Sequence, residues 1–456
     1  MSDAINVKID TASTSIPELR SMSRLRELQH NPLEFLSTLT QEYGDIVQIK
    51  LFFWPVVIIN HPDYIKHVLQ ENYRNYDKNV PIFNLFRPIL GNGLVTNYGG
   101  ESWLRQRRLM QPAFHRQRTA TLGQIITTAT QQQLQSWEHL AREQQSVDVA
   151  EEMMHLTLNI VGHSLFSLDI TSKTNTFGNA FSQANAFLLE YFNRPFPPLS
   201  VPTRRNRGFQ KNVRTLDKVV YEIVQQRHSR QSQEEDLLSM LIEARDEETG
   251  EGMSDQQLRD EVMTLLIAGH ETVANALAWS WYLLSQHPEV EQRLHNELDQ
   301  VLAGRTPTIE DLPQLPYTRM VFEEAMRLYP PVWIIMRKSL GEDTIGKYPL
   351  PANTYVAWST YAMHRHPDFW EQPEKFYPEH FTAEQVARRP RHAYIPFSHG
   401  PRICIGNNFA MLEAQLVLAS IAQRYHMELV PGHPVEPNPL MTLSPRHGIM
   451  MKLHQR

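Results

Sequence analysis

The chain has 456 residues, of which 41% are hydrophobic and 21% are charged, a composition typical of a globular protein with a large core. Its formal net charge of −6 argues against a general nucleic-acid binder. The single cysteine, Cys404, excludes an intrachain disulfide and a zinc site built from cysteines alone.

The N-terminal segment has no basic stretch followed by an apolar one, so we expect no signal peptide. We expect residues 1–20 to be flexible or loosely packed. The longest apolar run, residues 51–59, is interrupted by Pro55 and is too short to cross a bilayer, so no transmembrane anchor is expected. A lone unpaired cysteine favours a reducing compartment, and hence a cytoplasmic protein. Without repeats or long linkers, residues 1–456 are expected to form a single domain.

Hydrophobic periodicity predicts a mainly α chain with a small β region. Residues 45–60 are expected to form two strands joined by a turn near Trp54, and residues 354–358 a further strand. Residues 195–206 and 228–235 are expected to be exposed loops. Helices are predicted over residues 61–71, 102–110, 120–143, 150–168, 209–228, 256–286, 289–302, 317–328 and 407–425.

The helix predicted over residues 102–110 carries an indole and a guanidinium group on one face. Trp103 and Arg107 are four residues apart, and both side chains suit a carboxylate partner. The alternative for Trp103 is a core aromatic residue.

The longest predicted helix has the pentapeptide AGHET, residues 268–272, at its middle. The helix is expected to begin with a capping box of Ser254 and Gln257 and to end before Pro288. Glycine at this place costs about 1 kcal/mol relative to alanine. A threonine hydroxyl group can also compete for the backbone carbonyl one turn earlier. Together these residues permit a local opening of the helix. The alternative is a glycine and a threonine that simply face solvent, and we expect His270 to be a packing or surface residue.

Cys404 lies in the segment FSHGPRICIG, residues 397–406. Gly400 and Gly406 let the backbone approach a flat cofactor and a sulfur atom closely. A helix predicted directly after Gly406 would lower the pKa of the thiol, and Arg402 can pair with an anionic cofactor group. The segment therefore suits one thiolate ligand on one metal. The alternative is a buried structural cysteine.

Three segments of the chain resemble motifs of the cytochrome P450 superfamily. The pattern Phe-x-x-Gly-x-Arg-x-Cys-x-Gly over residues 397–406 is similar to the family's haem-ligand loop, and residues 268–272 are similar to its oxygen-activation motif. Glu324-Ala-Met-Arg327, followed by LYPP, is similar to its Glu–Arg lock. The motifs occur in the family's order and approximate spacing. By itself, each of the two shorter motifs is weak, because surface Glu–Arg pairs and helical Gly–Thr pairs are common.

The resemblance implies the cytochrome P450 fold, a triangular helical prism with a long central helix over haem b. In that family a cysteine thiolate donates electron density through the haem iron to bound dioxygen and promotes O–O cleavage. The implied activity is a haem-thiolate monooxygenase that uses O2 and two electrons to oxidise a small apolar substrate. The stretches 268–275 and 328–337 resemble bacterial members that hydroxylate fatty acids and carotenoids, so a fatty acid or a terpenoid or carotenoid-like molecule is expected.

The resemblance also assigns roles to individual residues. Cys404 is the implied iron ligand, and the implied lock is structural. The family most often has arginine where this chain has His380, so we expect a weaker and pH-sensitive lock. The residues that the resemblance assigns to the substrate pocket are apolar, and the alternative is that they are ordinary core residues. For Arg337 the alternative is a structural role without a haem contact. The implied sets are Phe397, Gly400, Arg402, Cys404, Gly406, Trp103, Arg107 and Arg337 for haem; Ala268, Gly269, Glu271 and Thr272 for oxygen activation and proton relay; Glu324, Arg327 and His380 for the lock; and Phe83, Phe86, Leu265, Val332 and Ile335 for the substrate pocket.

Electrons are expected to come from a ferredoxin or flavodoxin with its reductase, because the chain has no cysteine cluster and no length for a fused reductase. Two basic clusters are candidates for docking that donor, and ordinary solvated surface is the alternative. They are Arg105, Arg108, Arg116 and Arg118, and Arg388, Arg389 and Arg391. We expect a monomer with no nucleic-acid partner and no integral membrane association.

Two other activities remain open. A peroxide-driven peroxygenase or a hydroperoxide-rearranging enzyme would keep the haem but need no electron donor. The Glu271–Thr272 pair argues against these, because such enzymes can dispense with a proton relay. The third hypothesis is a non-catalytic haem sensor.

Overall fold

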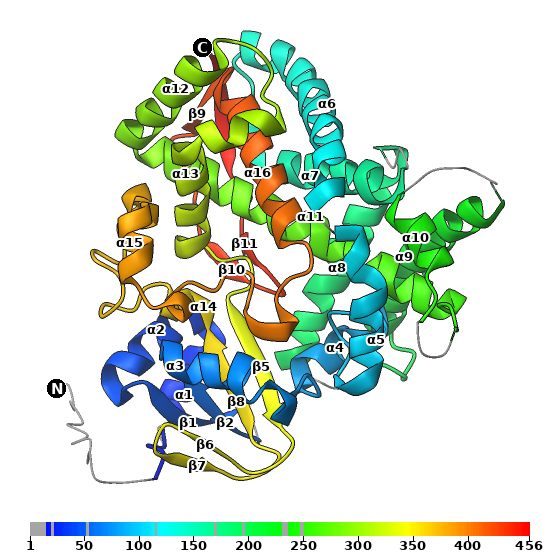
Figure 1. Cartoon of the computed structure of the whole chain (residues 1–456), viewed down its shortest axis with the longest axis vertical. Coiled ribbons are helices and arrows are strands. Elements are labelled where there is room, and N and C mark those ends of the chain that lie inside the picture. Colours follow the sequence, from blue (N-terminus) through cyan, green and yellow to red (C-terminus); the bar gives the residue numbers. More distant parts are fainter. Residues whose placement is uncertain are drawn as a thin grey trace. The chain divides into compact units, whose positions relative to one another are not determined.

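The computed structural model describes residues 15–19, 22–51, 54–114, 116–167, 171–193, 197–229, 236–246 and 250–456. Its elements are mainly helices with small sheets, which confirms the predicted fold class (Figure 1). The chain divides into two compact units, each built from segments far apart in the sequence. Unit 1 comprises residues 1–81, 327–375 and 380–404, and unit 2 comprises residues 82–326, 376–379 and 405–456. The single-domain expectation stays a prediction.

Unit 1 is built around a five-stranded sheet with the strand order β1-β2-β8-β5-β3. β1 and β2 are antiparallel, β2 and β8 are parallel, and β8 and β5 are antiparallel. The strands predicted over residues 45–60 and 354–358 are confirmed. Trp54 begins β2, however, so the connection falls at residues 52–53, which lie outside the described part of the chain. The strands are β1 (Ile46–Leu51), β2 (Trp54–Ile59), β3 (Tyr76–Asp77), β5 (Ile334–Ser339) and β8 (Tyr355–Ser359).

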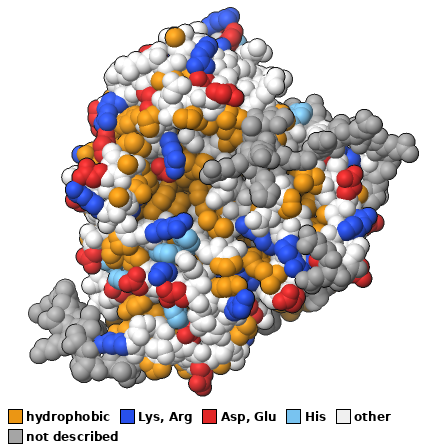
Figure 2. Space-filling model, in the orientation of Figure 1, with side chains coloured by type: hydrophobic (Ala, Val, Ile, Leu, Met, Phe, Trp, Pro, Cys, Tyr) orange, Lys and Arg blue, Asp and Glu red, His pale blue; other side chains and the backbone are white. Residues whose placement is uncertain are grey.

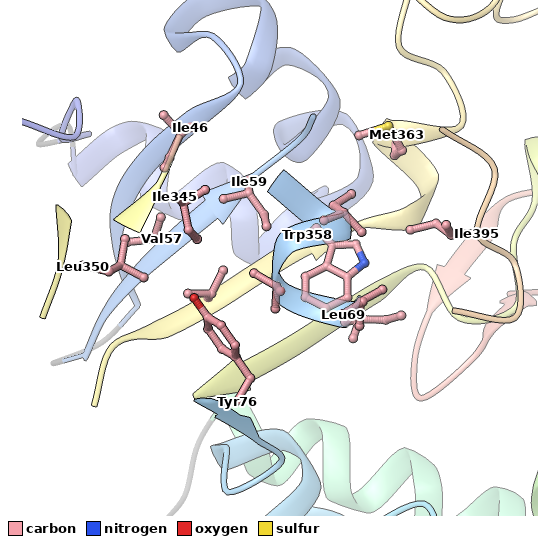
Figure 3. Packing of buried hydrophobic residues seen from close by; sticks show 14 of the residues in the cluster. Ile46, Val57, Ile59, Leu69, Tyr76, Ile345, Leu350, Trp358, Met363 and Ile395 are labelled. Atoms are coloured by element: carbon pink, nitrogen blue, oxygen red, sulfur yellow. The ribbon is translucent and has the colours of Figure 1, made fainter. Parts of the chain in front are cut away.

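Both faces of β2 are covered by apolar side chains. Val57 and Ile59 belong to one cluster with Trp358, shown in Figure 3, whereas Val56 and Ile58 belong to a second cluster with α2 (Pro32–Tyr43). Alternate residues of a strand point to opposite faces, so a continuous run of valine and isoleucine is expected for a strand buried on both sides.

The N-terminal segment is partly described and is attached to the sheet. Leu19 is buried, its amide donates to the carbonyl of Gln48 in β1, and the amide of Gln48 donates to the carbonyl of Pro17. The expected loose packing therefore does not extend to residues 17–19, while residues 1–14 and 20 lie outside the described residues. The other elements of unit 1 are α1 (Met22–His30), α3 (Pro62–Lys66), η1 (His67–Glu71, a π-helix), η2 (Tyr73–Asn75), β6 (Asp343–Ile345), β7 (Tyr348–Leu350), α14 (Thr360–Met363), α15 (Ala383–Arg388), η6 (Arg391–Ala393) and η7 (Gly400–Arg402).

Unit 2 is a helical assembly around α11 (Asp255–Gln286). α11 packs against α7 (Val149–Phe166), α9 (Arg204–Ser229) and α16 (Asn407–Ala422), and α16 packs against α6 (Arg116–Arg142). Its remaining elements are α5 (Gly100–Met110), η3 (Gln111–Phe114), β4 (Ser146–Asp148), α8 (Thr171–Asn193), α10 (Leu237–Glu243), α12 (Pro288–Leu302), η4 (Ile309–Gln314), β9 (Tyr425–Leu429), β10 (Pro437–Pro439), β11 (Leu443–Pro445) and β12 (Met450–Gln455). Three elements cross a unit boundary. α4 (Pro81–Leu90) begins on the last residue of unit 1, the last two residues of α13 (Pro316–Leu328) belong to unit 1, and η5 (Pro378–Phe381) passes into unit 1 at residue 380.

The predicted helices are present, although the one over residues 61–71 is divided into α3 and the π-helix η1, and no range was given for α1, α2, α4 and α10. α9 begins at Arg204 rather than residue 209, because the Thr203 hydroxyl group accepts the amide proton of Asn206 at 3.1 Å and starts the helix earlier. α8 was not predicted, although Phe177 and Phe181 lie on its buried side. None of the described helices is long and apolar enough to cross a membrane.

Candidate active site

The cysteine loop, residues 397–404 of unit 1, is a tight turn closed by its own backbone. The amide of Cys404 donates to the carbonyl of Phe397 at 3.0 Å, and the amide of Ile403 donates to the carbonyl of Gly400 at 3.0 Å. The side chain of Cys404 is exposed. The loop therefore presents the thiol on a rigid turn, as a metal ligand requires.

Gly400 has a structural reason that the sequence did not reveal. Its φ is +70°, and a Cβ atom at this position would lie 2.0 Å from the carbonyl oxygen of Leu69 in η1. A side chain is therefore excluded both by the backbone conformation and by the neighbouring π-helix. The prediction attributed Gly400 to the approach of a cofactor, whereas packing within unit 1 is sufficient to require it.

Gly406 is different, because the protein's own packing would accept a side chain there. Its φ is −91°, and the nearest atom to an added Cβ would be Cε1 of Phe114 at 4.0 Å. Glycine at this position fits the close approach of a bound group rather than of protein atoms. α16 begins at the next residue, Asn407, which confirms the predicted helix start after the thiol.

Two arginines of unit 1, one buried and one half-buried, repel one another electrostatically. Arg337 on β5 is 4% exposed, and its Nη1 donates to the carbonyl of Met336 at 2.9 Å. Burial and the charge of Arg402 lower the pKa of Arg337 to about 9, with Asp77 opposing this. Burial lowers the pKa of Arg402 to about 10. Two guanidinium ions in a poorly solvated place repel one another unless an anion joins them. This donor set therefore fits the two carboxylates of haem.

In unit 2, α5 carries the other two predicted carboxylate partners. Trp103 is 4% exposed and Arg107 is half-buried, and their four-residue spacing places them on one side of the helix. Their contact with a haem carboxylate stays a prediction.

The pentapeptide of residues 268–272 lies in unbroken helix. The Oγ1 of Thr272 donates to the carbonyl of Ala268 at 2.7 Å, as the sequence predicted. α11 nevertheless runs without interruption from Asp255 to Gln286, so the expected local opening is not a break in the helix. A Cβ atom on Gly269 would lie 3.0 Å from Cγ2 of Val161, so this glycine also allows the close approach of α7. One half of the predicted capping box is confirmed, because the Ser254 hydroxyl group accepts the amide proton of Gln257 at 3.2 Å. The reciprocal bond from the Gln257 side chain stays a prediction.

Glu271 is buried and has two polar neighbours that the sequence did not reveal. Its Oε1 accepts from Oγ1 of Thr442 at 2.9 Å and from Nδ2 of Asn185 at 3.4 Å. Burial raises the pKa of Glu271 to about 7, and the Thr442 hydrogen bond opposes the rise. Asn185 lies on the unpredicted helix α8, and Thr442 lies beside β11 without a motif around it. Only the three-dimensional structure could bring them to Glu271.

His270 is a packing residue, as expected. It is 2% exposed, its Nδ1 lies 2.5 Å from the carbonyl oxygen of Leu266, and its ring contacts Phe177 and Phe181 edge-on. Burial lowers the pKa of His270 to about 4, so the ring is neutral at pH 7.

Arg327 is a fully buried structural anchor in unit 1. It donates to the carbonyl oxygens of His364, Pro373 and Lys375 at 2.9, 2.6 and 2.9 Å, and its guanidinium lies 5.0 Å from the ring centroid of Trp370. Three backbone acceptors compensate a buried cation well. The guanidinium therefore fixes the segment 364–375.

The other two members of the predicted lock also bind the backbone of the neighbouring segments. Glu324 Oε1 accepts the amide proton of Tyr377 at 2.8 Å in unit 2. In unit 1, Nε2 of His380 lies 2.7 Å from the carbonyl oxygen of Glu371, and its ring packs edge-on against Trp370. A direct three-membered Glu–Arg–His lock stays a prediction.

The five predicted pocket residues have different environments. Phe86 and Leu265 are buried in unit 2 and Phe83 is half-buried, whereas Val332 is 37% exposed in unit 1. Ile335 belongs to the unit 1 core cluster around Trp358, which supports the core alternative for that residue.

Several arginines of the two predicted basic clusters have partners within the protein. Arg388 pairs with Glu384 at 2.5 Å on the surface, and Arg391 is exposed. Arg389 instead lies 3.7 Å above the ring of Trp370 and donates to the carbonyl of His380.

In the other cluster, Arg105 donates to the carbonyls of Glu251 and Gly252 at 3.1 Å, and Arg105 and Arg108 both approach Asp246. The side chains of Arg116 and Arg118 lie outside the described part. Charges of both signs are interspersed on the face shown in Figure 2.

Comparisons with known proteins agree over nearly the whole chain. The family model described as Cytochrome P450 matches residues 12–453. Cyclooctat-9-en-7-ol 5-monooxygenase of Streptomyces melanosporofaciens is 36% identical over 426 residues, which cover 92% of this chain and 90% of the relative. Pentalenene oxygenase of Streptomyces avermitilis is 32% identical over 431 residues, which cover 94% of each chain. The crystal structure of the cytochrome P450DA heme domain superposes with a TM-score of 0.87 at 26% identity, covering 97% of this chain and 98% of that chain.

Proposed function

The chain belongs to the cytochrome P450 family, and from this membership we propose that it oxygenates a terpenoid-like apolar substrate with electrons from a separate protein. Membership of this family makes the protein a haem-thiolate monooxygenase. When bound, haem b supplies the activation of O2 and the transfer of one oxygen atom to the substrate.

Cys404 is the proposed axial ligand of the haem iron. It is the only cysteine among the 456 residues, and its side chain is exposed on a turn closed by backbone hydrogen bonds. Arg337, which is buried, and Arg402, which is half-buried, support the assignment, because two guanidinium groups that repel one another suit the two haem carboxylates. Trp103 and Arg107 are proposed as further carboxylate partners, and Phe397 as a packing partner of the sulfur.

Glu271 and Thr272 are the proposed proton relay. A carboxyl group with a pKa of about 7 is divided nearly evenly between its two protonation states at neutral pH, so it can both accept and release a proton. The adjacent Thr272 hydroxyl group donates to the Ala268 carbonyl and thereby has a defined orientation. Ala268 and Gly269 complete this stretch of the helix.

The proposal of a terpenoid substrate rests on the names of the relatives. Those proteins are named for cyclooctat-9-en-7-ol and for pentalenene, and both names denote mainly hydrocarbon molecules with at most one hydroxyl group. The apolar side chains of Phe83, Phe86 and Leu265 are compatible with such a molecule. We therefore prefer a terpenoid to a fatty acid.

A small acidic ferredoxin or flavodoxin, served by its own reductase, is the proposed electron donor. In the cluster before the cysteine loop, Arg388 and Arg391 are exposed cations that could meet an acidic partner. A cytoplasmic location would suit both the donor and a chain with a single cysteine.

A substrate screen on the haem-loaded full chain tests this function. Polycyclic terpene hydrocarbons and alcohols would be compared with fatty acids of equal carbon number through the low-spin to high-spin change of the haem spectrum. We expect the shift with terpenes, and then oxygenated product when a ferredoxin, its reductase and NADPH are added. Cys404→Ser is the control, and it should lose the thiolate-type Soret band of the reduced carbon monoxide complex.

Three outcomes would contradict parts of the proposal. A spin shift and product with fatty acids alone would replace the terpenoid class. Equal turnover with hydrogen peroxide and without electron donors would favour the peroxygenase. An unchanged rate of haem reduction in the double variant Arg388→Glu, Arg391→Glu, with every donor tried, would remove the docking surface.

A further inference from the structure

We propose that Thr442 is a positioning residue for Glu271, and that its hydroxyl group orients the buried carboxyl group so that Glu271 carries its proton on Oε2. The proposal rests on the proposed relay function of Glu271. It adds a second segment of the chain, the β10–β11 hairpin, to the machinery of proton delivery.

The hairpin is held along one face of α11. Glu271, Asn275 and Trp279 are spaced by four residues, so they lie one above the other on the helix. Nδ2 of Asn275 donates to Oγ1 of Thr442 at 3.0 Å, and Nε1 of Trp279 donates to the carbonyl oxygen of Leu443 at 2.9 Å. All of these atoms belong to unit 2. The side chains of α11 thus fix the position of Thr442 along the helix.

The hydrogen bonds at Thr442 have one direction. An amide nitrogen can only donate, so the bond from Asn275 occupies Oγ1 as an acceptor. Thr442 is 3% exposed, and its one hydroxyl proton has a partner at Oε1 of Glu271, 2.9 Å away. Turning that proton elsewhere would leave a buried donor without an acceptor, which costs about 1–3 kcal/mol. Oε1 of Glu271 is therefore held as an acceptor.

The second carboxyl oxygen of Glu271 is consequently the one that binds and releases the proton. Asn185 also donates to Oε1, at 3.4 Å, while Oε2 is buried and has no hydrogen-bond partner among the described residues. With both donors on Oε1, a proton placed there would compete with them. A proton on Oε2 meets no such competition and is available for transfer.

The neighbouring groups leave this arrangement undisturbed near neutral pH. Asn185 from α8 and Thr442 from the hairpin do not titrate, and His270, next to Glu271 on α11, is neutral. Glu413 on α16, which packs against α11, is a buried acid whose pKa is raised well above its usual value by burial. Thr442 is then the neighbour that tunes the proton affinity of Glu271 through its hydrogen bond.

Infrared spectroscopy of the ferric haem-loaded chain tests the proposal without turnover. The carbonyl stretch of protonated Glu271 would be assigned by its loss in Glu271→Gln and followed over pH 5–9. In Thr442→Val we expect its midpoint to move up by about one pH unit, because the lost donor had favoured the charged form. Thr442→Ser should keep the wild-type midpoint. Ser444→Ala removes a hydroxyl group from the same hairpin and should change nothing.

Two infrared results would overturn the proposal: an unchanged band and midpoint in Thr442→Val, or no band that depends on Glu271 anywhere in that pH range. If the valine variant does not fold, Thr442→Ala decides in its place, because it removes the same donor without adding a methyl group.

Turnover supplies an independent readout. With an oxygenated substrate in hand, Thr442→Val should lower kcat several-fold and divert electrons to hydrogen peroxide, while KM stays constant. A rise in KM with unchanged kcat would instead make Thr442 a substrate contact and overturn the positioning role. Should no apolar substrate be oxygenated by the wild type, the proposed function fails while the infrared comparison still decides the role of Thr442.

Discussion

The cysteine loop and the surroundings of Glu271 are built in opposite ways. Hydrogen bonds between residues seven or fewer positions apart close the cysteine loop, as the bond from Cys404 to Phe397 shows. Glu271 instead depends on Asn185 and Thr442, which are 86 and 171 positions away in the sequence. A metal ligand can be presented by local backbone geometry, whereas the proton affinity of an acid is set by whatever the fold packs around it.

The two regions also treat buried charge differently. Arg337 and Arg402 have lowered pKa values of about 9 and 10, yet both stay protonated at pH 7. The pKa of Glu271 is raised to about 7, so its charge changes near neutral pH. The arginines therefore suit a permanent electrostatic clamp, and Glu271 suits a group that moves protons.

The largest effect is expected from Gly400→Ala, which attacks the local geometry. The new Cβ would lie 2.0 Å from the Leu69 carbonyl oxygen, at a φ of +70° that alanine rarely adopts. The cysteine loop should lose its shape, and the protein should lose the thiolate-type Soret band and several kcal/mol of stability. Spectra of the reduced carbon monoxide complex and urea unfolding would measure both.

Gly406→Ala is the matched control for that experiment. Among the described residues beyond its two chain neighbours, the nearest atom to its Cβ lies 4.0 Å away, so folding should be unaffected. Any weakening of haem binding in this variant then reports crowding by the cofactor. Equal loss of stability in both variants would show that local packing does not distinguish the two glycines.

The next largest effect is expected at the non-local site, in Glu271→Gln. A buried acid with a raised pKa stabilises the fold fully below its unfolded pKa of about 4.5, and this contribution is lost as the pH rises through about 7. Removing the acid should therefore raise the free energy of unfolding by about 3 kcal/mol at pH 8 and hardly change it at pH 4.5. Denaturant unfolding at both pH values measures the difference. Glu289→Gln, at an exposed position on α12, is the matched control and should not raise the free energy of unfolding at pH 8.

A smaller effect is expected when one of the two proposed haem-carboxylate partners, Arg337 and Arg402, loses its charge. Arg337→Gln should speed haem release to a scavenger protein by about tenfold, as expected for one charge-assisted hydrogen bond. Lys338→Gln is the control, because the next residue of β5 points to the opposite face of the strand. Equal release rates in the two variants would remove Arg337 from the proposed haem contacts.

These contrasts explain what could be predicted from the sequence. Patterns that fold locally were recognisable, including the cap at Ser254, the hydroxyl bond from Thr272 and the helix after Gly406. α8 was missed because its threonine, serine and asparagine residues have low helix propensity, although its apolar residues recur at helical spacing. Thr442 had no pattern at all. Its role depends on tertiary contacts, and a sequence carries no local signal for those.

The smallest effect is expected at Gly269, where both kinds of constraint meet. Alanine should stabilise α11 by about 1 kcal/mol through helix propensity, but its Cβ would lie 3.0 Å from Cγ2 of Val161 in α7. The net change in the free energy of unfolding should therefore stay below about 1 kcal/mol. In a Val161→Ala background the crowding is removed, so the same substitution should become stabilising. A double-mutant cycle by denaturant unfolding measures this coupling, for which we expect about 1 kcal/mol. If Gly269→Ala has the same effect in both backgrounds, the close approach of α7 does not require glycine at this position. Its place in the pentapeptide would then have to be explained by the oxygen chemistry of the helix alone.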